Sequence, residues 1–240
     1  MQKVLSTMRK AIEKYKLIED GDKIAVGVSG GKDSLVLLKA LKAFQKFNLF
    51  NYEIYAVLID NYSGKVNYSK IKKFCKDLDV ELVIEKTDIK HVVFDVRKET
   101  NPCSLCAKMR RGALNSVCKR LGCNKLALAH HKQDVITTFF MSLLYEGRLS
   151  TMLPKAYMTN SKITLIRPLY LTEEETIINA SKNFEILKSK CPADKDTKRE
   201  VVKDYIAKLE TDFPNSRQHI ENAILNPDGY NLLDKLNKDK

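Results

Sequence analysis

The 240-residue sequence has no tryptophan and only four histidines, so its 42 lysines and arginines form no basic-aromatic ladder. Thirty acidic residues leave a net charge of +12. This excess favours a polyanionic partner, because surface lysines and arginines gain from phosphate contacts and from counterion release. Charge alone does not distinguish a nucleic-acid-binding protein from a basic soluble protein.

The sequence also lacks any apolar run near the roughly 20 residues that span a bilayer, which excludes membrane insertion. The segment Met1–Lys16 has no continuous apolar core and no small-residue cleavage site, so we expect a cytoplasmic protein. In a reducing compartment, the six cysteines indicate metal or catalytic ligands together with buried thiols, rather than disulfides.

A glycine-rich loop, Ser29 to Ser34 (Ser-Gly-Gly-Lys-Asp-Ser), lies between an apolar segment typical of a buried strand and a segment typical of a helix. The two glycines allow a tight turn and a close approach of the backbone to a ligand, and the amides of a helix start favour an anion. We therefore expect a phosphate site. It is not a Walker A loop, because Val26 and Asp33 occupy positions where that motif requires Gly and Ser or Thr.

Alternating apolar and amphipathic segments predict an α/β fold with a doubly wound parallel sheet. The predicted strands span residues 24–28, 52–59, 80–85, 125–129 and 163–169, and the predicted helices span 1–21, 33–47, 66–78, 88–99, 103–121 and 135–145. A shift in composition near residue 171 divides the chain. We expect an N-terminal helix (1–21), a nucleotide-binding domain (22–171) and a helical appendage (172–240) with helices at 172–188, 196–212 and 214–225.

Polar residues follow two of the predicted strands at the carboxyl edge, where open α/β sheets bind their ligands. Asp60 ends the second strand, and backbone groups there are candidates to hold adenine. His130, His131 and Asp134 follow the fourth strand, and this run suits Mg²⁺ or phosphate. The alternative is that both histidines are only packed or solvated.

Cys103 and Cys106 follow a proline at a predicted helix start, and their spacing puts both sulfurs on one face of the first turn. A metal or cluster fits this pair, although a redox pair and half of a zinc site share the spacing and no second such pair occurs. Cys191 is the candidate third ligand, with an isolated buried thiol as the alternative. The remaining cysteines, which we expect to be buried, are Cys75, Cys118 and Cys123.

Four segments carry a resemblance to a known family. In order they are Gly-Asp-Lys-Ile-Ala-Val-Gly-Val-Ser-Gly-Gly-Lys-Asp-Ser, Cys-Ser-Leu-Cys-Ala-Lys-Met-Arg-Arg-Gly, Leu-Ala-His-His-Lys-Gln-Asp and Ile-Arg-Pro-Leu. Together they resemble the TtcA family of tRNA 2-thiocytidine synthetases, in the PP-loop superfamily that cleaves ATP between the α and β phosphates. The resemblance implies an ATP- and Mg²⁺-dependent tRNA thiolase whose [4Fe–4S] cluster is held by Cys103, Cys106 and Cys191.

The reaction implied by this resemblance begins when the C2 carbonyl oxygen of cytidine 32 attacks the α-phosphorus of ATP, and sulfur then displaces AMP. The resemblance implies ATP-binding roles for Val28, Ser29, Gly30, Gly31, Lys32, Asp33, Ser34, Asp60, His130 and His131. It implies catalytic roles for Lys32, Asp33, Arg110 and Asp134. The implied partners are tRNA and a sulfur donor, such as a cysteine desulfurase or free sulfide, and a homodimer is compatible with the sequence.

Two positions depart from the family pattern. Gln133 replaces a carboxylate, and Asp194 replaces the last cysteine of a second Cys-x-x-Cys, so Asp194, sulfide and water are alternatives for the fourth iron ligand. The alternative functions are thiolation or adenylation of another tRNA base or of a small molecule, and tRNA or nucleotide binding without chemistry. The helix at 196–212 is expected to bind tRNA through exposed cations that include Lys198, Arg199 and Lys203.

Overall fold

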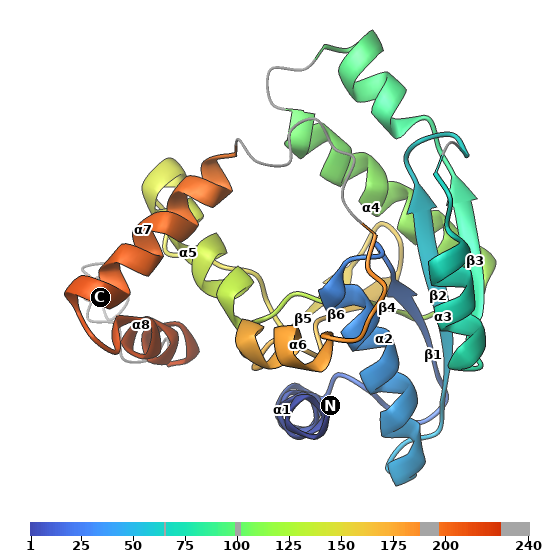
Figure 1. The fold of residues 1–240 in the computed structure, drawn as a ribbon, viewed down its shortest axis with the longest axis horizontal. Coiled ribbons are helices and arrows are strands. Elements are labelled where there is room, and N and C mark those ends of the chain that lie inside the picture. Colours follow the sequence, from blue (N-terminus) through green and yellow to red (C-terminus); the bar gives the residue numbers. More distant parts are fainter. Residues whose placement is uncertain (65, 99–101, 188–196, 227–240) are drawn as a thin grey trace, which may run out of the picture. The chain divides into compact units, whose positions relative to one another are not determined.

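The computed structural model describes residues 1–64, 66–98, 102–187 and 197–226 (Figure 1). Its contacts divide the chain into two compact units, residues 1–133 with 153–194 and residues 134–152 with 195–240. This division follows packing rather than function, so the expected domain boundaries after residues 21 and 171 stay predictions.

The first unit is built on a six-stranded sheet with the order β3-β2-β1-β4-β6-β5. The strands are β1 (Asp22–Gly27), β2 (Tyr52–Asp60), β3 (Glu81–Lys86), β4 (Lys125–Ala127), β5 (Lys155–Met158) and β6 (Ile163–Ile166). All neighbouring strands are parallel except β5 and β6. The predicted doubly wound α/β class is confirmed, and the five predicted strands are present. Strand β5 was not predicted, because Lys-Ala-Tyr-Met is short and has no β-branched residue.

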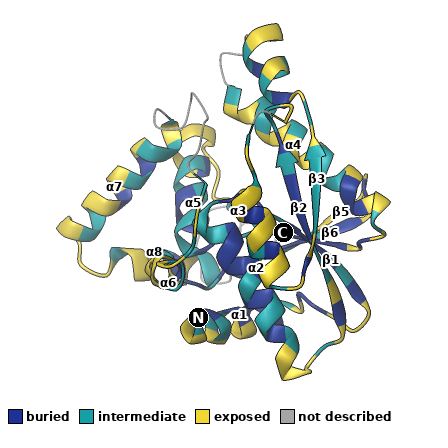
Figure 2. Ribbon diagram, turned by 45° about the vertical axis from the view of Figure 1, so that its right-hand side comes forward, coloured by how far each residue is buried: buried dark blue, intermediate teal, exposed yellow. Residues whose placement is uncertain are grey.

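Both faces of the sheet are covered, because successive residues of a strand point to opposite sides. Ile24 and Val26 of β1 join one buried cluster, whereas Ala25 joins the other. The first face is covered by α1 (Gln2–Tyr15), α2 (Lys32–Phe44), α3 (Ser69–Asp77) and α6 (Glu174–Ala180), and the second by α4 (Pro102–Arg120). The short turns are η1 (Gln45–Phe47) and the π-helical η2 (His91–Val96). Figure 2 shows the central strands as largely buried.

Helix α6 is shorter than the predicted helix 172–188, and Thr172 lies before its N-cap. The hydroxyl of Thr172 is buried and lies 2.7 Å from the hydroxyl of Thr7, and the N-cap residue is Glu173, which makes no side-chain cap. After Ala180 the chain leaves the helix, and Phe184 packs edge-to-face on Phe74 with ring centroids 5.1 Å apart. Tertiary packing of this segment therefore replaces the helix that the sequence favours locally.

A buried ion pair ties the amino ends of β1 and β4 together. The ammonium of Lys125 lies 2.6 Å from the carboxylate of Asp22 and 3.0 Å from that of Glu19, and Lys125 and Asp22 are each only 3% exposed. The Asp22 carboxylate also accepts hydrogen bonds from the Glu19 amide and from the Asn124 side chain. The site lies at the edge of the sheet opposite the predicted ligand edge.

The second unit is helical and consists of α5 (Lys132–Glu146) from Asp134 onward, α7 (Lys198–Asp212) and α8 (Ser216–Leu225). Ile136, Val202 and Ile206 form its buried core, against which Phe140, Met141, Ile220 and Ile224 pack. Thr197 caps α7, because its hydroxyl accepts a hydrogen bond from the Glu200 amide. None of the helices in the described ranges is long and apolar enough to cross a membrane.

Candidate active site

The predicted phosphate loop leaves the sheet after Val28, whose amide donates to the Val57 carbonyl at 2.8 Å. The loop then hydrogen-bonds to itself. The Ser34 hydroxyl donates to the Gly31 carbonyl at 3.0 Å and accepts from the Ser29 amide at 3.2 Å, and the Gly31 amide donates to the Ser29 hydroxyl at 3.3 Å. Both serines thus shape the loop, and Ser34 is buried.

Each of the two glycines has a separate structural role. Gly30 has φ +85°, and a Cβ there would lie 2.8 Å from a methyl carbon of Leu187, whose amide donates to the Gly30 carbonyl at 2.9 Å. A side chain is therefore excluded by conformation and by space. Gly31 is the N-cap of α2 and makes no side-chain cap, which suits the amides of the first turn to binding an anion.

Lys32 lies between two carboxylates. Its ammonium is 2.8 Å from Asp33 and 3.0 Å from Glu174 of α6. Burial by itself would lower the pKa of Lys32, but the hydrogen bonds and charges of Asp33 and Glu174 outweigh burial, so the pKa is raised. Glu174 lies near the start of the predicted helix 172–188 and was not among the predicted site residues.

The histidines after β4 lie beside this loop. The Nε2 atom of His131 is 3.9 Å from the Asp33 carboxylate, and the His131 side chain is buried. His130 accepts a hydrogen bond on Nδ1 from Nε of Arg167 at 3.0 Å. Lys132 pairs with Glu173. The structure therefore brings the His-His segment, the Arg-Pro segment and the loop together within the first unit.

The carboxylate of Asp60 stabilises the turn that follows β2. Its carboxylate accepts hydrogen bonds from the Tyr62 amide at 2.9 Å, the Gly64 amide at 2.6 Å and the Tyr68 hydroxyl at 2.8 Å. The side chain is buried and orders this turn at the carboxyl edge. Any contribution of Asp60 to adenine binding therefore comes through the backbone, as the sequence suggested, and stays a prediction.

The cysteine pair lies in the first turn of α4. Cys103 is exposed and Cys106 is partly exposed. With Arg110 they occupy positions i, i+3 and i+7, which share one helix face. That face continues to Leu114, whose side chain lies 3.8 Å from where a Cβ on Gly27 would be. The thiols and Arg110 therefore extend from the helix face that packs over β1, the strand that leads into the phosphate loop.

Three other cysteines are buried, as the sequence predicted. Burial raises the pKa of Cys75 to about 11, of Cys118 to about 12 and of Cys123 to about 11. These thiols stay protonated at neutral pH and are poor metal ligands. Cys191 and Asp194 lie outside the described residues. Among the side chains that are described, no group of three or more His, Cys, Asp or Glu forms a metal site.

Asp134 belongs to the second unit, where α7 orients it. The Arg199 guanidinium lies 2.6 Å from the Asp134 carboxylate and 3.5 Å from the Thr138 hydroxyl. Asp134 and Thr138 are one helical turn apart, so a single arginine fixes this face of α5. The sequence predicted that Arg199 binds tRNA, and its contact with Asp134, the predicted catalytic carboxylate, was not foreseen.

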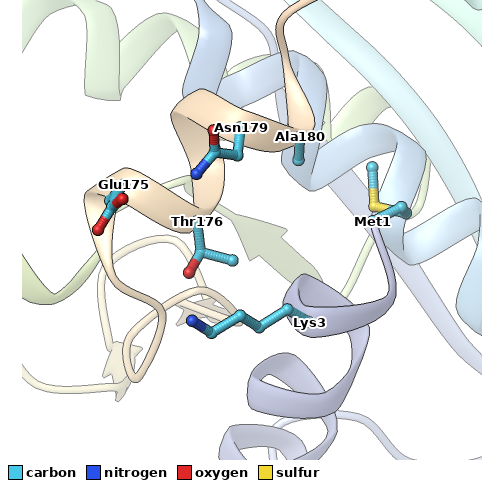
Figure 3. A pocket seen from close by; sticks show the side chains of 6 residues that line it. All are labelled: Met1, Lys3, Glu175, Thr176, Asn179 and Ala180. Carbon is cyan, nitrogen blue, oxygen red and sulfur yellow. The ribbon is translucent and has the colours of Figure 1, made fainter.

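A cavity of about 190 Å³ opens between α1 and α6 (Figure 3). It is lined by Met1, Lys3, Glu175, Thr176, Asn179 and Ala180. None of these residues was predicted to belong to the active site. Glu174 contacts the loop lysine, whereas the next residue of α6, Glu175, lines this cavity.

Comparison with known proteins identifies the family to which this chain belongs. The PP-loop domain family matches residues 2–209. The chain is 35% identical over 238 residues to the tRNA-cytidine(32) 2-sulfurtransferase of Geotalea uraniireducens, covering 97% of this chain and 94% of that protein. It is 37% identical over 229 residues to the enzyme of the same name from Dichelobacter nodosus, covering 94% and 86%. The chain belongs to the TtcA family of PP-loop proteins.

A solved structure agrees with this assignment. The U34-tRNA thiolase NcsA from Methanococcus maripaludis, determined with its [4Fe–4S] cluster, superposes with a TM-score of 0.74 and 26% sequence identity. The match covers 92% of this TtcA-family chain and 77% of NcsA. The resemblance noted from the four sequence segments is thereby confirmed.

Proposed function

We propose that this TtcA-family protein is an ATP-dependent tRNA thiolase that replaces the C2 oxygen of cytidine 32 with sulfur. The observation that carries the proposal is the placement of two accessible thiols on the α4 face that continues over β1, the strand feeding the phosphate loop. The names of the relatives support the substrate, and the PP-loop supports ATP. The tRNA substrate supports the cytoplasmic location that we propose for the enzyme.

In the first stage, the C2 carbonyl oxygen forms a bond to the α-phosphorus of ATP, and the bond to pyrophosphate breaks. The amides at the start of α2 bind phosphate oxygens, and Lys32 neutralises the charge that develops on them. Asp33 and Glu174 hold the Lys32 ammonium in place before ATP arrives. Catalysis at this stage comes mostly from positioning and charge.

Carboxylate and imidazole groups near the loop provide ligands suited to the Mg²⁺ that accompanies ATP. Asp33 and His131 lie at the loop within the first unit. Asp134, which belongs to the second unit, is proposed separately for proton transfer or Mg²⁺ binding. Arg199 orients the Asp134 carboxylate within the second unit. Arg110, which shares a face with the cysteines, is proposed to meet phosphate from ATP or from tRNA.

In the second stage, sulfur forms a bond to C2, and the oxygen leaves with AMP. Cys103 and Cys106 fit the binding of an iron–sulfur cluster because they are the accessible thiols on one face of a helix start, and Cys191 is the proposed third ligand. A cluster held by these three cysteines would provide an iron site for binding sulfide. The sulfur donor is proposed to be free sulfide or a cysteine desulfurase.

The proposed function is tested with the anaerobically reconstituted protein, ATP, sulfide and an unmodified tRNA transcript. We expect AMP and 2-thiocytidine to form with cytidine at position 32, and neither with a transcript that differs only by uridine there. Thiolation of a different nucleotide would keep the chemistry and change the substrate. AMP formation without thiolated RNA would favour adenylation of a small molecule, and absence of both products would favour a binding protein without chemistry.

A further inference from the structure

Helix α7 carries an exposed stripe that the proposed reaction does not use. Lys198, Val201, Tyr205 and Lys208 are spaced i, i+3, i+7 and i+10, so they share one face of the helix. Tyr205 is 63% exposed and Val201 is 48% exposed. The core residues of α7, Val202 and Ile206, occupy the adjacent side and are buried. The stripe is thus an apolar and basic surface that the core of this unit does not cover. Figure 2 colours much of α7 as exposed.

A second tyrosine joins this stripe from α5. The Lys198 ammonium lies 4.6 Å from the centroid of the Tyr145 ring, a cation–π contact within the second unit. Tyr145 is 47% exposed, so its ring remains accessible beside the lysine. We name Tyr145, Lys198, Val201, Tyr205 and Lys208 the α5–α7 stripe.

The lysines of the α5–α7 stripe are available for phosphate. Neither Lys198 nor Lys208 forms an ion pair with any residue in the described part of the chain, whereas the neighbouring cations do. Arg199 pairs with Asp134, and Lys203 pairs with Glu200 at 2.9 Å. Arg199 and Lys203, which the sequence assigned to tRNA binding, therefore form ion pairs within the protein. The positive charge that remains available to a ligand lies beside the two tyrosines.

We propose that the α5–α7 stripe binds unpaired nucleotides of the tRNA, with bases stacked on Tyr205 and Tyr145 and phosphates at Lys198 and Lys208. The proposal rests on the proposed function, which supplies tRNA as the substrate. Position 32 lies in the anticodon loop, whose bases are available for stacking on aromatic side chains. Exposed tyrosines interleaved with cations match single-stranded RNA better than a duplex, which is recognised by its backbone shape.

The chain has no tryptophan, so Tyr205→Trp introduces a single fluorescent reporter at the stripe. We expect an anticodon stem-loop RNA to quench this fluorescence saturably, and the same stem closed as a duplex without the loop to leave it nearly unchanged. Tyr157→Trp is the matched control, because Tyr157 is equally exposed at 62% but lies on β5 in the first unit. Equal quenching at both positions, or none at Tyr205→Trp by an RNA that binds, would overturn the proposal.

Affinity for the stem-loop provides the second measurement. Tyr205→Ala should weaken binding about tenfold, the range expected for loss of one base–aromatic stack, whereas Tyr205→Phe and Tyr157→Ala should bind as the wild type does. Unchanged affinity in Tyr205→Ala, with wild-type thiolation intact, would reject the stripe and leave the proposed function standing. Failure of the wild-type protein to bind any tRNA would instead reject the proposed function, and the stripe proposal with it.

Discussion

Lys32 is the residue on which the proposed first stage depends most. Lys32→Ala should lower AMP formation by about 100-fold or more, because a fixed positive charge at the phosphates is lost from the transition state. The side chain is partly exposed and outside the core, so thermal unfolding should change little. Lys42→Ala is the matched control, since Lys42 lies on the same helix and pairs with the exposed Asp79. Wild-type AMP formation in Lys32→Ala would remove the loop from the mechanism.

The cysteines divide into two chemical classes. Near pH 8, iodoacetamide should modify Cys103 and Cys106 of the iron-free protein rapidly, because both are accessible. Cys75, Cys118 and Cys123 should react far more slowly, since pKa values of about 11 to 12 leave few thiolates and the side chains are buried. Mass spectrometry of the peptides measures each rate.

The same division predicts iron retention after anaerobic reconstitution. About four iron and four sulfide should bind per chain, with loss in Cys103→Ala, Cys106→Ala and Cys191→Ala. Cys75→Ala, a buried thiol, serves as the control and should keep its iron. Stoichiometric zinc in place of iron would contradict the cluster and make the Cys103–Cys106 pair part of a structural site.

At the scale of elements, the sequence predicted the helices and strands that a local sequence pattern marks. The strand–loop–helix around Gly30 was predictable because apolar runs, paired glycines and a helical pattern all agree there. Strand β5 was not, since it exists only by pairing with β6. Helix α6 ends early because Phe184 and Leu187 pack elsewhere. The contacts of Glu174 with Lys32 and of Arg199 with Asp134 join residues far apart in the chain, so no local pattern identifies them.

The ion pair between β1 and β4 gives a prediction about stability. Lys125→Met should lower the free energy of unfolding by about 3–5 kcal/mol, because it leaves the buried Asp22 carboxylate without its cation. Chemical denaturation measures the change. Adding Asp22→Asn to Lys125→Met should recover part of the loss, since the remaining group is neutral. Lys23→Met, which removes a lysine from the exposed pair with Glu53, should lower the free energy of unfolding far less. Equal costs for the two lysine variants would contradict the role of burial.

At the scale of the whole molecule, the net charge of +12 predicts how tRNA binding responds to salt. If the protein contacts about four phosphates, affinity should fall on the order of 100-fold between about 50 and 200 mM salt, through counterion release. Filter binding across this range measures the slope. Lys208→Ala should make the slope of log affinity against log salt concentration shallower, by an amount that corresponds to nearly one phosphate contact. Lys203→Ala removes a lysine already paired with Glu200 and should change this slope less. A salt-independent affinity would favour a small-molecule substrate.

The central claim is that the base oxygen itself is adenylated and leaves with AMP. A tRNA carrying oxygen-18 at C2 of cytidine 32 tests it directly, in a reaction with ATP, sulfide and the reconstituted protein. The account predicts that the AMP formed with each 2-thiocytidine carries the heavy oxygen in its phosphate, as measured by mass spectrometry. Unlabelled AMP would mean that water, rather than the base, attacks the α-phosphorus, and would contradict the account.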